Sequence, residues 1–124
     1  MSDYTYFNLN PNREEKEDCV IRAIGLGTGL QYYTVENLLY LIADKCECEM
    51  LNVECYRTLL EDIFEYKVFY CTHGETVGDI AEKYNNNIVI IRIQGHLTSS
   101  IYGHIFDLWD CSDKLVDRFW VVQN

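Results

Sequence analysis

The chain has 124 residues, is 48% hydrophobic and 14% aromatic, and carries a formal net charge of −10 from ten Lys and Arg against twenty Asp and Glu. This length suits one domain and is too short for two, so we expect a single domain over residues 1–124. The apolar content excludes long disorder. The excess of carboxylates disfavours direct nucleic-acid binding, because such a surface repels phosphates.

The lengths of the hydrophobic runs and the first residues of the chain indicate in which cellular compartment the protein is expected. The longest apolar runs, such as residues 88–91, are far shorter than a membrane span. Residues 1–4 contain neither a basic region nor an apolar segment of the signal-peptide type. We therefore expect a cytoplasmic protein without membrane contact, whose six cysteines are reduced.

Helical patterns occupy most of the first two thirds of the chain. Residues 1–17 are polar and irregular. Asp18 is a good N-cap for a helix over about residues 19–27, which we expect three glycines to end. Apolar residues at helical spacing predict further helices over residues 34–45, 52–65 and 76–84.

Strand patterns dominate the remainder. A short strand is predicted at residues 67–71, and a nearly continuous β-branched run at 88–93 predicts a strand that is buried on both faces. Residues 96–102 and 105–109 flank the turn signal Gly103-His104, and 119–122 form a last strand. The order indicates an α+β domain in which N-terminal helices pack on a C-terminal antiparallel sheet.

Cys19 falls in the first turn of the first predicted helix. The helix dipole and the free N–H groups of that turn stabilise a thiolate, so a cysteine there is suited to act as a nucleophile. A small buried core residue is the alternative interpretation of the same position.

His96 and Asp107 are predicted to share one face of the hairpin. With a two-residue turn, Asp107 lies opposite residue 98 or 100, and residues 96, 98 and 100 share a face. A three-residue turn would separate the two side chains. A carboxylate beside a histidine fixes its tautomer and raises its basicity. The same face carries Thr98 and Trp109, which we expect to line a site.

Three cysteines form a separate cluster. Cys46, Cys48 and Cys55 are spaced C-x-C-x6-C, whereas structural zinc sites usually use two tight pairs. Buried, inert thiols and a metal site are the two interpretations of this cluster, and we favour the thiols.

Several segments resemble small papain-like cysteine-protease-fold proteins of phages and prophages of Gram-positive bacteria. The similarity lies in Asn10-Pro11, in residues 18–24 with their Asp-Cys-Val-x-Arg-Ala block at 18–23, in Gly95-His96, and in the aromatic-Asp and Trp-Asp pairs of residues 103–111. It covers roughly residues 8–30 and 76–122. The Cys block is the more specific part, and the middle of the chain is less alike.

The resemblance implies a papain-like fold, with Cys19 as nucleophile, His96 as base and Asp107 as the residue that orients the base. It implies a cysteine peptidase, or a related thiol amidase or acyltransferase, that works through a thioester without cofactor or metal. The broader papain pattern has a Gln ahead of the Cys, and this chain has none there. Asn10 or Asn12, with the backbone N–H of Cys19, is the expected substitute as oxyanion donor.

A catalytically degenerate member of the same fold is the alternative. Such a protein would bind and inhibit a host factor through its acidic surface. A peptide or protein substrate is the expected partner of the enzyme, with a basic one favoured by the net charge, and a host protein is the expected target of the binder. A phage-encoded chain would act in the host cytoplasm.

Overall fold

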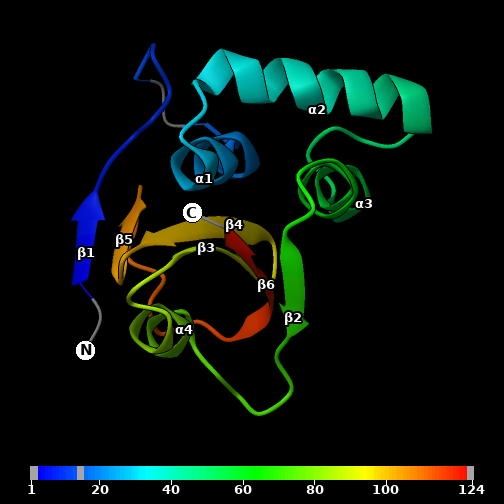
Figure 1. Ribbon diagram of the computed structural model, residues 1–124. Coiled ribbons are helices and arrows are strands. Elements are labelled where there is room, and N and C mark those ends of the chain that lie inside the picture. Colours follow the sequence, from blue (N-terminus) through cyan, green and yellow to red (C-terminus); the bar gives the residue numbers. More distant parts are fainter. Residues whose placement is uncertain (1–2, 14–15, 123–124) are drawn as a thin grey trace.

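One six-stranded sheet with helices on both faces makes up the fold (Figure 1). This computed structural model describes residues 3–13 and 16–122. The helical elements are α1 (Cys19–Thr28), α2 (Tyr32–Cys46), α3 (Val53–Arg57), the π-helical turn η1 (Thr58–Ile63) and α4 (Val77–Lys83). The strands are β1 (Asp3–Tyr6), β2 (Lys67–Tyr70), β3 (Ile88–Ile93), β4 (His96–Ile101), β5 (His104–Asp107) and β6 (Val116–Val122). The α+β class is confirmed.

The sheet has the strand order β1-β5-β4-β3-β6-β2. Four of its five strand pairs are antiparallel, but β1 pairs in parallel with β5. The expectations of a purely antiparallel sheet and of an irregular N-terminus are therefore wrong. Residues 3–6 are mostly exposed and polar, so their strand depends on the edge that β5 offers and leaves little trace in the local pattern.

Two of the three glycines that were expected to end α1 lie within the helix. The helix continues through Gly25 and Gly27 and stops at Gly29, whose φ of 78° is the left-handed cap conformation. A Cβ at position 27 would lie 2.6 Å from Cγ1 of the buried Ile90. Gly27 therefore lets α1 approach β3 closely, and the sequence-based end near residue 27 is one residue early.

The other helices follow their patterns with one exception. Thr76 and Asp79 form a capping box at the start of α4, which confirms Thr76 as a cap. The single helix predicted over residues 52–65 is instead the short α3 followed by the π-turn η1. Within the described residues, none of the helices combines the length and apolar character that crossing a bilayer requires.

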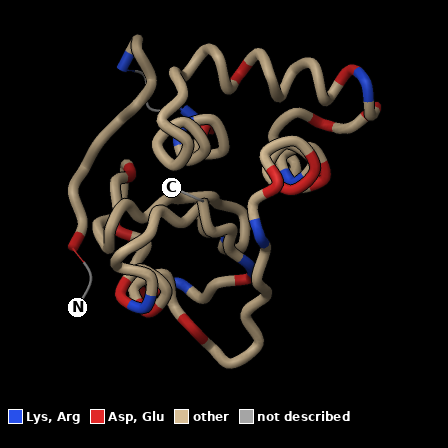
Figure 2. The backbone as a smooth tube through the Cα atoms, in the orientation of Figure 1, with Lys and Arg blue, Asp and Glu red and all other residues tan. Residues whose placement is uncertain are grey.

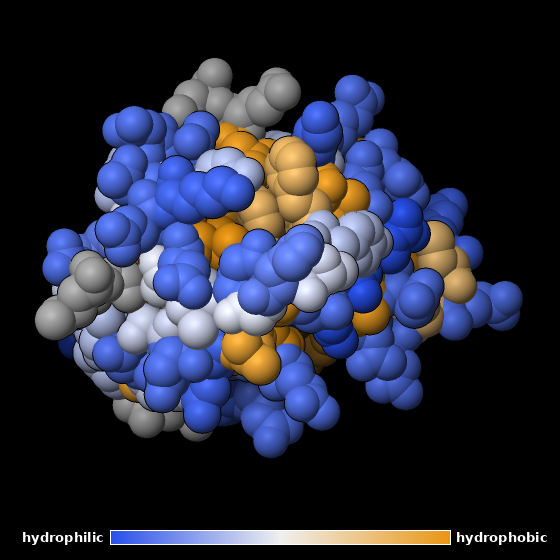
Figure 3. Space-filling model, turned by 90° about the horizontal axis from the view of Figure 1, so that it is seen from below, coloured by the Kyte–Doolittle hydropathy of each residue, from blue (hydrophilic) through white to orange (hydrophobic). Residues whose placement is uncertain are grey.

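Two apolar cores lie on opposite faces of the sheet. One joins α1, α2, α3 and η1 to one face and includes the fully buried Trp120. The other joins α4 to the opposite face through Val77, Ile80 and Ala81. Acidic residues occur on outer elements such as α3 and α4 (Figure 2), and the face viewed from the α4 side is largely hydrophilic around a central apolar area (Figure 3). Helices therefore pack against both faces of the sheet.

Candidate active site

Cys19 is the first residue of α1 and lines a pocket of about 570 Å³. Asp18 holds the N-cap position, but its side chain makes no capping hydrogen bond to the described helix. It accepts hydrogen bonds from Arg22 Nε at 2.7 Å, Tyr32 Oη at 2.7 Å and Asn10 Nδ2 at 3.1 Å. The expected side-chain cap is therefore wrong, and the first-turn N–H groups beside Cys19 are left to other partners.

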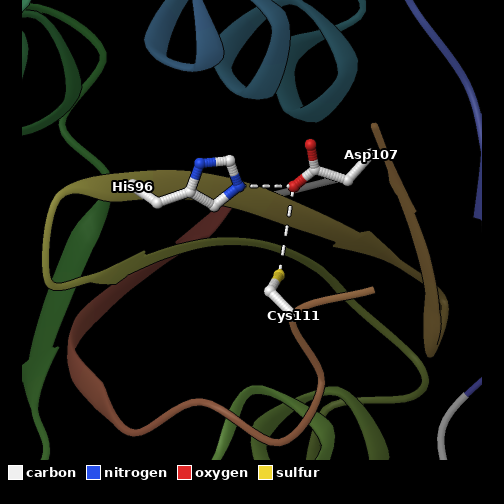
Figure 4. A group of neighbouring side chains, drawn as sticks. All are labelled: His96, Asp107 and Cys111. Atoms are coloured by element: carbon white, nitrogen blue, oxygen red, sulfur yellow. Dashed lines mark hydrogen bonds and ion pairs between the residues drawn. The ribbon is translucent and has the colours of Figure 1, made fainter. Parts of the chain in front are cut away.

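His96 and Asp107 come from the hairpin of β4 and β5. Its two-residue turn is Tyr102-Gly103, and both residues have positive φ, as a type I′ turn requires. His96 Nε2 lies 2.7 Å from Asp107 Oδ2, and a dashed line marks this contact in Figure 4. The carboxylate can only accept, so Nε2 is the donor, and Nδ1 is left for another partner. The predicted juxtaposition of these two side chains is confirmed.

Hydrogen bonding sets the charge state of His96. Burial of the ring opposes its protonation, but hydrogen bonds with Asp107, Cys111 and Cys19 outweigh burial and raise the pKa of His96 to about 11. Its side chain is 11% exposed and that of Asp107 is 2% exposed. These contacts therefore favour the imidazolium form of His96 at neutral pH.

The same contacts act on the thiol in the opposite direction. Burial disfavours the Cys19 thiolate, but hydrogen bonds from His96 and from the Leu97 backbone N–H, together with the charges of His96 and Arg22, lower the pKa of Cys19 below its ordinary value. The pKa of Cys19 is lowered and that of His96 is raised, and these opposite shifts favour a thiolate–imidazolium pair.

Arg22 acts on this pair through Asp107, the hydrogen-bond partner of His96. Its Nη1 donates to Asp107 Oδ1 at 3.0 Å while its Nε donates to Asp18, and its side chain is only 6% exposed. The Leu108 N–H donates to the same Asp107 oxygen at 2.7 Å. Asp107 is thus fixed on both oxygens. Sequence reasoning missed Arg22, although its i,i+4 spacing from Asp18 was a visible signal.

Cys111 is a second thiol at the site that sequence reasoning missed. It is fully buried, and its Sγ lies 3.9 Å from Asp107 Oδ2 (Figure 4). Within the described part of the chain, His96, Asp107 and Cys111 are the one set of three residues whose potential metal-ligating atoms all lie within 4.8 Å. The cysteine cluster of the α2–α3 region is not brought together in this way.

Trp109 is the one auxiliary residue that the structure places as predicted. It lines the pocket, and its ring centroid lies 5.0 Å from that of His96. Thr98 is 1% exposed and is not among the described pocket-lining residues. Thr98 therefore does not line the pocket as expected; its buried side chain lies behind the lining, where it helps to lower the pKa of Asp107.

The two asparagines lie elsewhere than expected. Asn10 is buried, and its Nδ2 donates to Asp18 and Tyr32. Asn12 Nδ2 donates to the Tyr33 hydroxyl at 3.1 Å. Neither belongs to the pocket lining in the described residues. Asn10 instead supports Asp18, and the proposed amide donors to an oxyanion are not where that role requires them.

No family model, curated protein or solved structure matches this chain. The site must therefore be judged by its own geometry. A thiol with a lowered pKa, a charged histidine and an orienting carboxylate meet at the edge of a pocket, which is the arrangement that nucleophilic attack on a carbonyl needs.

Proposed function

We propose that the protein is a cysteine hydrolase of papain-like architecture, which cleaves amide bonds or transfers their acyl group through a thioester on Cys19. The observation that carries this proposal is the position of His96, which hydrogen-bonds with Asp107 and lines the same pocket as Cys19, whose pKa it lowers. Such a chain of contacts supplies a nucleophile, an acid–base group and a residue that orients it.

In the first half of the reaction, the Cys19 thiolate attacks the carbonyl carbon, and a C–S bond forms. The carbonyl electron pair moves to oxygen and then returns as the C–N bond breaks. His96 gives its Nδ1 proton to the leaving amine, which departs neutral. Asp107 keeps the ring in the required orientation throughout.

In the second half, His96 takes a proton from water, and the resulting hydroxide attacks the thioester carbon. The C–S bond breaks, and the acid and the Cys19 thiolate are released while His96 is again protonated. An amine that replaces water at this step gives acyl transfer, and the groups on the protein do the same work in both outcomes.

Backbone N–H groups of the first turn of α1 are the donors best placed to stabilise the oxyanion. Asp18 does not cap that turn, so the described Asp18 side chain leaves these groups to a substrate. The positive end of the helix dipole adds to the stabilisation. This arrangement takes the place of the Gln of the broader papain pattern.

On the basis of the resemblance to phage and prophage proteins, we propose that this activity acts in a bacterial host cytoplasm on a peptide or protein substrate. A second function on the same fold is capture of a basic host protein, which the net charge of −10 favours. The two functions differ in one respect, since only the enzyme needs the Cys19 sulfur.

Cleavage of a complex peptide mixture tests the proposal. The purified protein is incubated with a proteome-derived peptide library, and new termini are identified by mass spectrometry. We expect new termini with the native chain and at least about a 100-fold loss with Cys19→Ala, because the nucleophile is removed. Cys46→Ala, which changes an exposed thiol on α2, is the matched control and should keep the activity. Equal cleavage by the native chain and Cys19→Ala would contradict the proposal.

A further inference from the structure

The pocket beside Cys19 carries a charge opposite to that of the whole chain. The chain has twice as many acidic as basic residues, yet the charged residues that line the pocket, apart from the thiolate–imidazolium pair of Cys19 and His96, are Lys16, Arg22 and Arg92 against Glu17 alone. Three cations and one carboxylate thus face a site in a protein of net charge −10. The pocket lining is therefore predominantly basic, although the chain as a whole is acidic.

Arg92 is held in place without being neutralised. Its Nη1 donates to Asp117 Oδ2 at 2.7 Å, and Arg118 Nε donates to the same oxygen at 2.7 Å. Arg92 and Arg118 are direct cross-strand partners in β3 and β6. Two guanidinium groups therefore share one carboxylate, and an excess positive charge remains at this wall of the pocket.

The balancing carboxylates lie behind the cations. Asp18, Asp107 and Asp117 pair with Arg22 or Arg92, but none of the three belongs to the pocket lining. The pocket wall therefore presents guanidinium groups to an anion, while their carboxylate partners lie outside the described lining. This layering favours an anionic ligand even though the charges nearly cancel in sum.

Tyr56 connects this wall to the nucleophile. It lines the pocket with Cys19 and Arg92, and burial raises its pKa to about 12, which the charge of Arg92 opposes and that of Cys19 reinforces. Its ring packs edge-on against buried Trp120, with centroids 5.9 Å apart. Tyr56 therefore forms part of the same pocket wall as Arg92, with its ring packed against the core.

We infer that the pocket binds its substrate through a carboxylate, held by Arg92 next to the carbonyl that Cys19 attacks. The substrate class is a peptide with an acidic side chain or a free carboxylate close to the cleaved bond. A guanidinium can hold a carboxylate by two parallel hydrogen bonds, which gives direction as well as attraction. This inference rests on the proposed function and opposes the basic partner that the net charge alone favours.

Two alkylating agents that differ in charge test the inference on the intact protein. Iodoacetate and iodoacetamide transfer similar groups, but only iodoacetate carries a carboxylate. Their rates at Cys19 are measured site by site by mass spectrometry and divided by their rates with free cysteine. We expect iodoacetate to be favoured at Cys19, against the net charge, and the preference to fall as salt rises.

The variant Arg92→Gln tests whether Arg92 causes the preference of Cys19 for iodoacetate. The iodoacetate-to-iodoacetamide ratio should fall by about three- to tenfold in Arg92→Gln, and Arg92→Lys should keep part of it. Arg57→Gln is the matched control, because it removes the same charge from α3, outside the described pocket lining, and should leave the ratio unchanged.

The outcomes separate this inference from the proposed function. If Cys19 reacts with iodoacetamide in mildly acidic solution but iodoacetate has no advantage, or if Arg92→Gln leaves the ratio unchanged, the carboxylate inference is overturned and the hydrolase proposal stands. If Cys19 reacts with neither reagent at neutral pH, both fail. Should Arg92→Gln not fold, the salt dependence of the native ratio and Arg92→Lys still decide the question.

Discussion

Arg22→Met will lower the free energy of unfolding by about 3 to 5 kcal/mol, because it leaves two buried carboxylates without their shared cation. Arg22 joins Asp18 on its own helix to Asp107 on β5, and all three side chains are at least 94% buried. Methionine has similar length and keeps the apolar contacts of the stem. Urea denaturation of the native chain and the variant measures the difference.

Arg57→Met is the matched control for this change. Arg57 makes the same kind of i,i+4 ion pair with Glu61, but its side chain is 34% exposed. The pair is worth at most about 1 kcal/mol, because water screens it. Equal losses in the two variants would show that burial of the Arg22 network contributes nothing. Arg22→Lys keeps the charge without the planar fork and should fall between the native chain and Arg22→Met.

His96→Ala will reduce turnover by about 100- to 10,000-fold, because it removes the group that transfers protons in both halves of the reaction. In the native chain the acidic limb of the pH–rate profile follows the lowered pKa of Cys19, and the alkaline limb follows the pKa of His96 of about 11. Without His96 the acidic limb should move up to the ordinary thiol range, near about pH 8.5.

Kinetics of peptide cleavage against pH measure both effects. His73→Ala is the control, since His73 lies in an exposed loop away from the described pocket lining and should leave rate and profile unchanged. A His96→Ala protein that keeps the native rate, with its acidic limb in place, would remove His96 from the mechanism. A loss of rate with an unchanged acidic limb would separate proton transfer from thiolate stabilisation.

The sequence was enough to place His96 beside Asp107, because that relation depends on local rules. Strand alternation and a short turn at Tyr102-Gly103 decide which side chains share a face. An Asp inside an otherwise apolar strand was also a local signal, since Asp is unfavourable there unless it has a partner. Cys19 was placed by the same kind of argument, from the start of α1.

Long-range contacts account for what could not be predicted. Arg22 lies 85 positions from Asp107 in the chain, and no spacing rule reaches that far. Alternation shows which face Thr98 shares but not whether another element covers that face, so its burial was missed. The parallel pairing of β1 depends on β5, about 100 residues later. Its own four residues, half-buried at most, carry little pattern.

The rate of Cys19 alkylation by iodoacetamide as a function of pH tests the central claim, the thiolate–imidazolium pair, most directly. Site-resolved mass spectrometry follows all six cysteines in one sample. The structure predicts that Cys19 already reacts in mildly acidic solution, well below the pH at which an ordinary thiol reacts, and that His96→Ala abolishes this difference. A Cys19 profile with a midpoint near the ordinary thiol value of about 8.5, or an unreactive Cys19, would contradict it.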